Sequence, residues 1–340
     1  MQGKIIGTGL IALDVILNGR VETPPKVFAG GSCGNVLTIL SFLGNESFPI
    51  ARLADNKYTD LLFEDLSKWN VNTSLISRDD DGNTPIIIHR IQKDKDGNPK
   101  HRFEFRNPFS GQWFPNYKPV LTKNVEQISA ALPLFPKAFY FDRVNRASIE
   151  LAKICRKRGA IVVFEPSSLK MDKQFLECLE VSHIIKFSNE RIKNYSEQFP
   201  NNKVPLEIET LGSQGLKYRF KSDEWKIINS FFIENILDTA GAGDWCTAGL
   251  INILGDSGLD FFNSVKPEII EYSLRYGQAL GALNCMFDGA RGLMYNINKN
   301  EIELLVNNMI LGEYKRINVM DINLNSKITL NKKFELSDIF

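Results

Sequence analysis

The sequence predicts an α/β fold with a mostly parallel central sheet, and two observations carry that prediction. Segments of strand and helix character alternate through the middle of the chain, which is the order that a parallel sheet requires. Residues 160–164 are apolar throughout, as expected for a strand buried on both faces. The chain has 340 residues, 43% of them hydrophobic, so it can bury a large core. One large domain with an appendage suits this length better than two independent domains.

The N-terminal third contributes the start of this sheet and part of a second layer. Lys4–Gly7 has the character of a short strand, and Val36–Leu43 that of a helix. Four further β-rich segments are expected to form a small sheet over one end of the core: residues 12–19, 22–28, 85–93 and 101–106. Residues 94–98 indicate a hairpin between the last two, because Asp-Gly and Gly-Asn tolerate positive φ. The alternative is a surface hairpin without a function.

The middle and C-terminal elements follow in order along the chain. The expected strands are Ala138–Phe141, Ala160–Phe164, Ser182–Lys186 and Leu206–Leu211. The helices among them are Ser148–Arg158 and segments near 172–179 and 189–198. Gly212 and Gly215 then mark a turn into Leu216–Phe220, where we expect the sheet edge to become antiparallel. Long helices are expected near 243–254, 267–286 and 299–311.

The composition argues against several kinds of partner and site. Lys and Arg number 41 against 40 Asp and Glu, and the net charge of +1 gives no electrostatic reason to expect nucleic acid or a membrane surface as partner. The five cysteines form no C-x-x-C pair and there are three histidines, which argues against disulfides or structural zinc. No export leader and no apolar run of about eighteen residues is present, so we expect a cytoplasmic protein.

Residues 7–12 match G-x-G-x-x-A, the pattern of a dinucleotide-binding turn. That interpretation requires a helix next and an acidic residue about twenty positions further on. Residues 13–17 are instead β-branched and apolar, and no acid lies near position 27. NAD binding is therefore disfavoured. The G-x-x-x-x-G-K-[ST] pattern is also missing, so any ATP chemistry here is not of the P-loop type.

Residues 238–248 are the most informative segment of the chain. Gly241, Ala242 and Gly243 let the backbone pass close to a ligand and point successive N–H groups one way. The run from Trp245 reads as a helix, so these amides lie at a helix N-terminus that favours an anion. Asp244 puts a like charge into this anion site, which suits an acid that takes a proton from a group attacking a phosphate. The alternative is an ordinary glycine-rich turn with Asp as a helix cap.

Two earlier features complete a pattern with this segment. Asp14 lies in an apolar stretch, and residues 30–35 read G-G-x-x-x-N at the start of a helix. With D-T-x-G-A-G-D at 238–244, the chain resembles the ribokinase or PfkB-type carbohydrate kinase family from about Lys4 to about Leu293. The resemblance implies a ribokinase-like three-layer sandwich with a mostly parallel central sheet and a small β-sheet lid. It implies a kinase domain over residues 1–311, with lid strands within about 12–28 and 85–106, and leaves 312–340 as an extension of unknown role.

The resemblance also implies an activity and its residues. A member of this family transfers the γ-phosphate of ATP to a hydroxyl of a small sugar or sugar derivative. Asp244 is then the general base and the amides of Gly241, Ala242 and Gly243 form the anion hole. The residues expected at the sugar are Asp14, Gly31 and Asn35. Those expected at the nucleotide are Thr210, Gly212, Gly215 and Asn284.

The expected cofactors are ATP and Mg²⁺, with a monovalent cation such as K⁺ at Asp238 where the family has one. Glu190 is the candidate for contact with Mg²⁺ through water, but this chain departs from the family here. The usual N-x-x-E is replaced by Ser188-Asn189-Glu190-Arg191, and on a helix Asn189 and Glu190 would point about 100° apart. Glu190 is alternatively a solvated first-turn acid. Residues 54–56 also lack the usual acidic pair, and Trp245 replaces a small residue.

The sequence identifies the partners and the substrate only in part. The resemblance implies a small sugar and ATP as ligands and a homodimer formed through the lid. Arg90, Arg102 and Arg106 could pair with a substrate carboxylate or phosphate, or could be solvated surface residues. The altered metal segment leaves a second function open, a non-catalytic sugar- or nucleotide-binding protein on the same fold.

Overall fold

The computed structural model describes residues 3–17, 24–93, 99–170, 172–200, 202–221, 224–312 and 335–340. The expected hairpin turn at 94–98 and most of the 312–340 extension lie outside this part of the chain. No helix within the described ranges is both long enough and apolar enough to cross a membrane.

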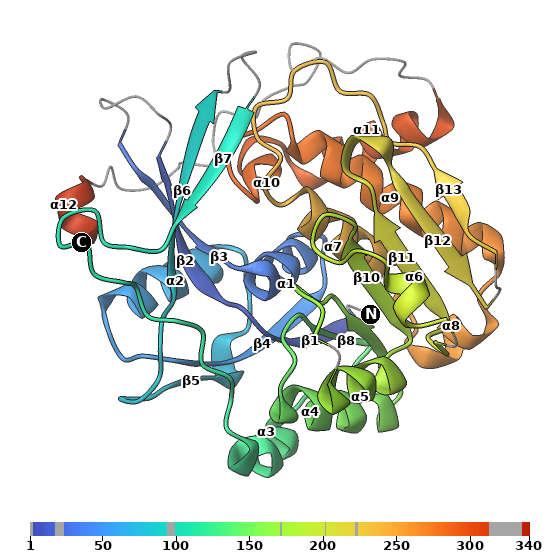
Figure 1. The fold of residues 1–340 in the computed structure, drawn as a ribbon, viewed down its shortest axis with the longest axis horizontal. Helices are drawn as coiled ribbons and strands as arrows, with labels where there is room; N and C mark the ends of the chain where they lie inside the picture. Colours follow the sequence, from blue (N-terminus) through green and yellow to red (C-terminus); the bar gives the residue numbers. More distant parts are fainter. Residues whose placement is uncertain are drawn as a thin grey trace.

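A large, mostly parallel sheet forms the centre of the molecule (Figure 1). Its order in the described part of the chain is β13-β12-β11-β10-β9-β8-β1-β4-β5. The strands are β1 (Lys4–Thr8), β4 (Glu46–Leu53), β5 (Ile76–Arg78), β8 (Ala138–Phe141), β9 (Ile161–Phe164), β10 (Ile184–Ser188), β11 (Leu206–Thr210), β12 (Leu216–Phe220) and β13 (Lys226–Ile228). All pairs from β5 to β11 are parallel, and β12 and β13 are antiparallel. The predicted α/β class and the antiparallel edge are confirmed.

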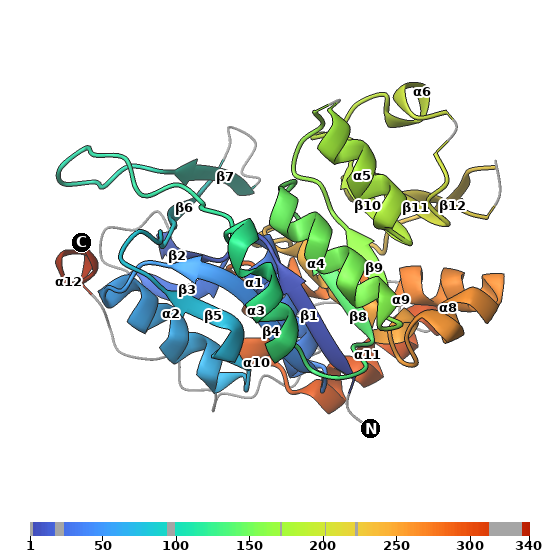
Figure 2. The same ribbon diagram turned by 90° about the horizontal axis from the view of Figure 1, so that it is seen from below.

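Helices cover both faces of this sheet (Figure 2). They are α1 (Ser32–Phe42), α2 (Lys57–Lys68), α3 (Val125–Ala131), α4 (Arg146–Lys157), α5 (Lys173–Val181), α6 (Tyr195–Gln198), α7 (Ala242–Leu254), α8 (Leu259–Ser264), α9 (Pro267–Asn284), α10 (Gly292–Asn296), α11 (Lys299–Leu311) and α12 (Leu336–Ile339). Short 3₁₀ turns lie at Thr73–Leu75, Thr122–Asn124 and Gly212–Gln214. Successive strand residues such as Ile5 and Ile6 enter two separate hydrophobic clusters, one with α1, α7 and α9 and one with α4 and α5.

A second sheet of four strands stands at one edge of this sandwich. Its order is β3-β2-β6-β7, with β2 (Ala12–Leu17), β3 (Lys26–Gly30), β6 (Ile86–Lys93) and β7 (Pro99–Glu104). Strands β6 and β7 extend away from the body of the molecule (Figure 1). The predicted lid is present, although its strands begin or end a few residues from the expected positions. Because residues 12–17 form a strand and not a helix, the G-x-G-x-x-A segment is not a dinucleotide-binding turn.

One predicted helix is wrong. The sequence suggested a helix over 189–198, but only Tyr195–Gln198 is helical. The segment after β10 is a turn instead, in which the amides of Arg191 and Ile192 donate to the Ser188 carbonyl. Asn194 then adopts a left-handed conformation, with φ of 56°, that a continuous helix does not allow. The helical geometry assumed for Asn189 and Glu190 therefore does not apply.

Candidate active site

Polar residues gather at the carboxyl ends of the parallel strands, among them Thr210 of the predicted nucleotide site. Asp142 follows β8, Glu165 follows β9, and Ser188 and Thr210 end β10 and β11 as neighbours in the sheet. The N-terminus of α7 lies at this edge, because Lys186 of β10 donates a hydrogen bond to the Gly243 carbonyl. This is the edge at which open α/β sheets bind their ligands.

The start of α7 has the backbone of an anion site. Gly241 precedes the helix with φ of 76°, and a Cβ at this position would overlap the carbonyl of Ala290. Only glycine therefore allows the loop to lie against the 289–291 segment. Ala242, Gly243 and Asp244 form the first helical turn, whose N–H groups have no acceptor within the helix. The Ala242 amide donates to the Thr239 carbonyl at 3.4 Å. The anion hole expected from the amides of Gly241, Ala242 and Gly243 stays a prediction.

Asp244 is a carboxyl group with an unusual environment. The side-chain amide of Asn35 donates to Asp244 Oδ2 at 2.7 Å, so two predicted residues 209 positions apart are in contact. Burial raises the pKa of Asp244 to about 7, with a further contribution from Glu165, while Asn35, Lys186 and Arg191 oppose the shift. A carboxyl with this pKa exchanges protons near neutral pH.

A buried network beneath Asp244 was not found from the sequence. Lys186 Nζ lies 2.6 Å from Glu165 Oε1 and 3.2 Å from the Gly243 carbonyl oxygen, and the Thr247 hydroxyl donates to Glu165 Oε2 at 2.6 Å. Burial alone would lower the pKa of Lys186, but the charge and hydrogen bond of Glu165, together with Cys246 and Asp244, outweigh burial and the pKa is raised. The available signal was Lys186 itself, a charged residue within an otherwise apolar strand.

The predicted sugar residues lie together on the other side of Asn35. A Cβ on Gly30 would overlap the carboxyl of Asp14, so that side chain lies directly against the G-G pair. Gly31 precedes α1 with φ of 77° and contributes a backbone hydrogen bond to Asp14. Asp14 and Asn35 line one small cavity. Burial raises the pKa of Asp14 to about 7, and Arg291 opposes this shift.

The predicted nucleotide residues differ from one another in exposure and in contacts. Thr210 ends β11, and Gly212 and Gly215 flank an exposed turn at the same edge of the sheet. Asn284 is fully buried, and its amide donates to the carbonyls of Ala240 at 2.9 Å and Gly289 at 3.4 Å. The side chain of Asn284 thus holds two loops together, and its contact with adenine stays a prediction.

The two candidate metal residues differ in setting. Asp238 is fully buried, and its carboxylate accepts the amides of Ala240 and Gly289, each at 2.7 Å. A monovalent cation binds oxygen ligands of this kind, a carboxylate with backbone carbonyls nearby. Cation binding at Asp238 stays a prediction. Glu190 is exposed in the turn after β10. Within the described ranges, no three or more His, Cys, Asp or Glu side chains form a cluster that could hold a metal.

The arginines considered for the substrate have partners on the lid. Arg90 Nε lies 2.9 Å from Glu104 across the β6–β7 pair, and Arg102 Nε lies 3.4 Å from the same residue. The guanidinium of Arg106 lies 4.1 Å from the centre of the Trp113 ring. These contacts favour the interpretation of all three as surface residues.

The comparisons with known proteins decide the family. The sequence pattern of the pfkB family carbohydrate kinases matches residues 17–294. The chain belongs to this family. It is therefore a phosphotransferase with an alcohol group as acceptor.

The kinase is 23% identical over 293 residues to a probable chloroplastic fructokinase of Arabidopsis thaliana, which covers 78% of this chain and 71% of that protein. The structure of a fructokinase from Xylella fastidiosa with bound ATP matches with a TM-score of 0.70 at 18% identity, covering 91% of this chain and 100% of that one. A fructokinase structure from Vibrio cholerae, with fructose, ADP and calcium, has a TM-score of 0.66 at 18% identity and covers 90% and 99%. These matches confirm the ribokinase-like fold.

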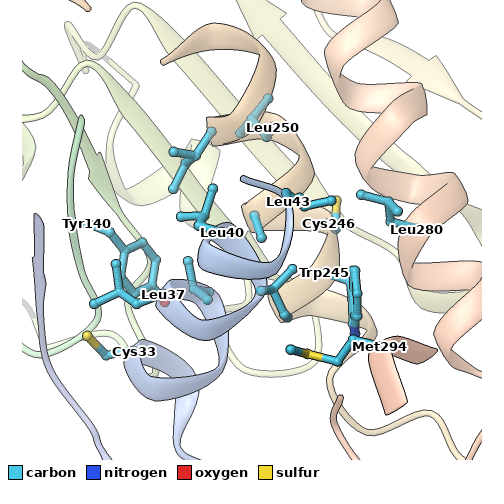
Figure 3. Packing of buried hydrophobic residues seen from close by; sticks show 14 of the residues in the cluster. Cys33, Leu37, Leu40, Leu43, Tyr140, Trp245, Cys246, Leu250, Leu280 and Met294 are labelled. Atoms are coloured by element: carbon cyan, nitrogen blue, oxygen red, sulfur yellow. The ribbon is translucent and has the colours of Figure 1, made fainter. Parts of the chain in front are cut away.

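Trp245, the departure beside the proposed base, is a packing residue of the kinase. Its indole is fully buried and lies edge-on to Phe42 of α1, with ring centres 6.1 Å apart. Figure 3 shows Trp245 in the cluster between α1 and α7, close to Met294. The large side chain therefore anchors the first turn of α7 in the core and does not fill the site.

Proposed function

We propose that this kinase transfers the γ-phosphate of ATP to a hydroxyl of a small sugar or sugar derivative, with Asp244 as the general base. The observation that carries the proposal is the 2.7 Å contact between Asn35 and Asp244. It joins the G-G-x-x-x-N segment, expected at the sugar, to the helix start expected at the phosphate. A hydroxyl held between them would lie within reach of both the base and the anion site.

In the proposed reaction the ionised Asp244 accepts the hydroxyl proton as the oxygen attacks phosphorus. The first-turn amides of α7 stabilise the negative charge on the transferring group, which is electrostatic preorganisation at a helix N-terminus. Lys186 fixes this turn through the Gly243 carbonyl and adds a positive charge below it. The turn containing Gly212 and Gly215 lies at the same edge and is the proposed nucleotide side. ATP in the Xylella fructokinase structure supports this choice of donor.

The proposed reaction also uses two kinds of metal ion. Mg²⁺ bound with ATP would neutralise charge on the phosphates. Glu190 is proposed to order the water shell of Mg²⁺, which keeps most of its waters. A monovalent cation would be held by Asp238 with the carbonyls of Ala240 and Gly289, next to the anion loop. Glu190→Gln should then raise the Mg²⁺ concentration that gives half-maximal rate. A titration that overlays wild type would identify Glu190 as a solvated turn residue.

A homodimer formed through the lid is proposed from the exposed aromatic side chains near β7. Phe103, Phe105, Phe109 and Trp113 are each about half exposed or more. A contiguous apolar patch formed by such side chains would be uncommon on a monomer. Molar mass by light scattering tests this proposal, with Phe105→Ser and Trp113→Ser as variants expected to shift a dimer towards monomer.

The alternative is a non-catalytic sugar- or nucleotide-binding protein, favoured only by the altered segment around Glu190. The experiment that separates the two measures ADP release from ATP with Mg²⁺ across a panel of pentoses, hexoses, sugar acids and nucleosides. A kinase accelerates ADP release with one or a few members of the panel. Binding of a sugar by calorimetry without any accelerated ADP release would establish the alternative.

A further inference from the structure

Arg291 is a buried cation that belongs to neither of the two motifs, residues 30–35 and residues 238–244. It follows the Gly289–Ala290 pair and is almost inaccessible to solvent. Its Nη2 donates to Asp65 Oδ2 at 2.6 Å and to the Ala29 carbonyl. Its Nε and Nη1 are buried and have no hydrogen-bond partner in the described part of the chain. Buried N–H groups without acceptors are costly and rare, so these two donors call for an explanation.

The guanidinium is held in one orientation from several sides. Asp65 of α2 accepts Nη2 of Arg291, the amide of Ala29 at 2.8 Å and the hydroxyl of Tyr295 at 2.8 Å. Tyr295 of α10 in turn accepts the indole N–H of Trp69 at 3.1 Å. Strand β3, helix α2 and helix α10 therefore fix the group, and its two remaining donors are preorganised.

The unused donors adjoin unused acceptors. Arg291 lines the same small cavity as Asp14 and Asn35. Asp14 Oδ1 and Asn35 Oδ1 are likewise buried and without a partner among the described residues. The cavity has a volume of about 10 Å³, room for one hydroxyl group. A sugar hydroxyl reaching into it can accept from Nε and Nη1 of Arg291 and donate to one of the two acceptors. An apolar ligand would leave every one of them unpaired.

The charges around the cavity restrict the ligand further. The positive charge of Arg291 is already paired with Asp65. Asp14 adds a carboxyl group and no further cation lines the cavity in the described ranges. A substrate carboxylate or phosphate placed here would meet no unpaired positive charge and would face Asp14. Uncharged hydroxyl groups carry no such penalty.

We propose that Arg291 is a specificity-determining residue of the sugar pocket, whose Nε–H and Nη1–H donate to an oxygen of an uncharged sugar that also donates to Asp14. This proposal rests on the proposed function, in that it assigns the sugar to the cavity beside Asn35. It names the substrate class as neutral polyhydroxy sugars and excludes their acid and phosphate derivatives.

The test uses Arg291→Lys, because a lysine keeps the positive charge next to Asp65 but lacks the forked donors. The variant should stay folded, with its melting temperature within a few degrees of wild type. Sugar affinity by calorimetry should fall about 10- to 100-fold, the size of lost hydrogen bonds to a charged donor. ATP affinity without sugar should not change. Arg219→Lys is the matched control, since Arg219 pairs with Glu207 at 2.6 Å on β12, outside this cavity.

A substrate series separates recognition from a structural role. Among monodeoxy analogues of the best sugar, one should bind wild type weakly and should lose nothing further in Arg291→Lys. Equal sensitivity of every analogue to the substitution, or unchanged sugar affinity in the variant, would overturn the proposal. Preference for a sugar acid over the neutral sugar would overturn it as well, while leaving the kinase activity intact. A third result is possible, in which Arg291→Lys weakens sugar binding but no sugar accelerates ADP release. That result would contradict the proposed function and leave the role of Arg291 intact.

Discussion

Asp244 must serve two needs that oppose each other. As the proposed base it has to be ionised, yet it lies beside the proposed anion site and close to Glu165. The structure meets both needs with a pKa of about 7, raised by burial and moderated by Asn35 and Lys186. The ionised form is then present at neutral pH without a permanent full charge in the anion site.

This pKa predicts the pH dependence of catalysis. Below about pH 7 the carboxyl is protonated and cannot accept the hydroxyl proton, so kcat/KM should fall about tenfold per pH unit on the acid side. It should level off above about pH 8. Lys186→Met should move the midpoint upward, because Lys186 favours the ionised form of Asp244. A flat profile between pH 5.5 and 8.5 in both proteins would show that no group with this pKa limits the reaction.

Asp14 predicts a pH dependence of stability. Its pKa is raised from 3.8 to about 7, so the native state keeps a proton that the unfolded state releases between these values. The stabilisation is complete below pH 3.8 and is lost as the pH rises through about 7. Asp14→Asn removes this loss, so its stability relative to wild type should rise by roughly 2.5 kcal/mol from pH 5 to pH 8. Urea unfolding at the two pH values measures it, with the exposed Asp80→Asn as control. Equal pH dependence of all three proteins would count against a perturbed Asp14.

At the scale of elements, the predictions succeeded where a local pattern had one physical cause. The strand Ala138–Phe141 was found from apolar residues alone, since a strand covered on both faces has no polar side. The tight loop before α7 was found because Gly241 has a positive φ and lies against Ala290, where another residue would clash. The segment 189–198 failed because Asn194 breaks a helix through its backbone angle, which composition does not reveal.

Other residues escaped prediction because their role depends on distant partners. Asp65 and Arg291 are 226 residues apart, and neither carries a motif. Glu165 and Lys186 meet only because β9 and β10 are neighbours in the sheet. Tertiary pairing of this kind leaves no spacing that a single sequence could show. The sequence thus predicted the residues that the structure brings together around Asn35, namely Asp14 and Asp244, but not the network that holds them.

The α7 helix start gives a prediction at this scale. Gly241→Ala should abolish most activity, at least about 100-fold in kcat, because its Cβ would displace the loop from the Ala290 carbonyl and misalign the anion amides. Gly312→Ala is a matched control, since Gly312 has φ of 77° and no neighbour within 4 Å of its Cβ position. The control should lose only about 1 kcal/mol of stability, the cost of alanine at a positive φ, and keep its kcat. An equal change in kcat in the two variants would show that the close approach of Gly241 to Ala290 is not needed for activity.

At the scale of the whole molecule, the site exists only when three parts of the fold come together. The lid strands supply Asp14 and the G-G pair, α1 supplies Asn35, and the C-terminal half supplies α7 and the loop around Gly289. Arg291 joins these parts directly, since it lies beside that loop and binds Ala29 of the lid. The proposed sugar and phosphate sites therefore lie on opposite sides of one contact, Asn35 to Asp244.

Asp244 is proposed to take the proton from the sugar hydroxyl, and the substitution Asp244→Asn removes this capacity. The amide keeps the shape of the side chain but cannot accept the proton. With the best sugar of the panel, the account predicts a fall in kcat of about 10²–10⁴, while the Kd for ATP holds or tightens because a like charge leaves the anion site. A variant that binds both substrates and turns over at a rate near that of wild type would contradict the account.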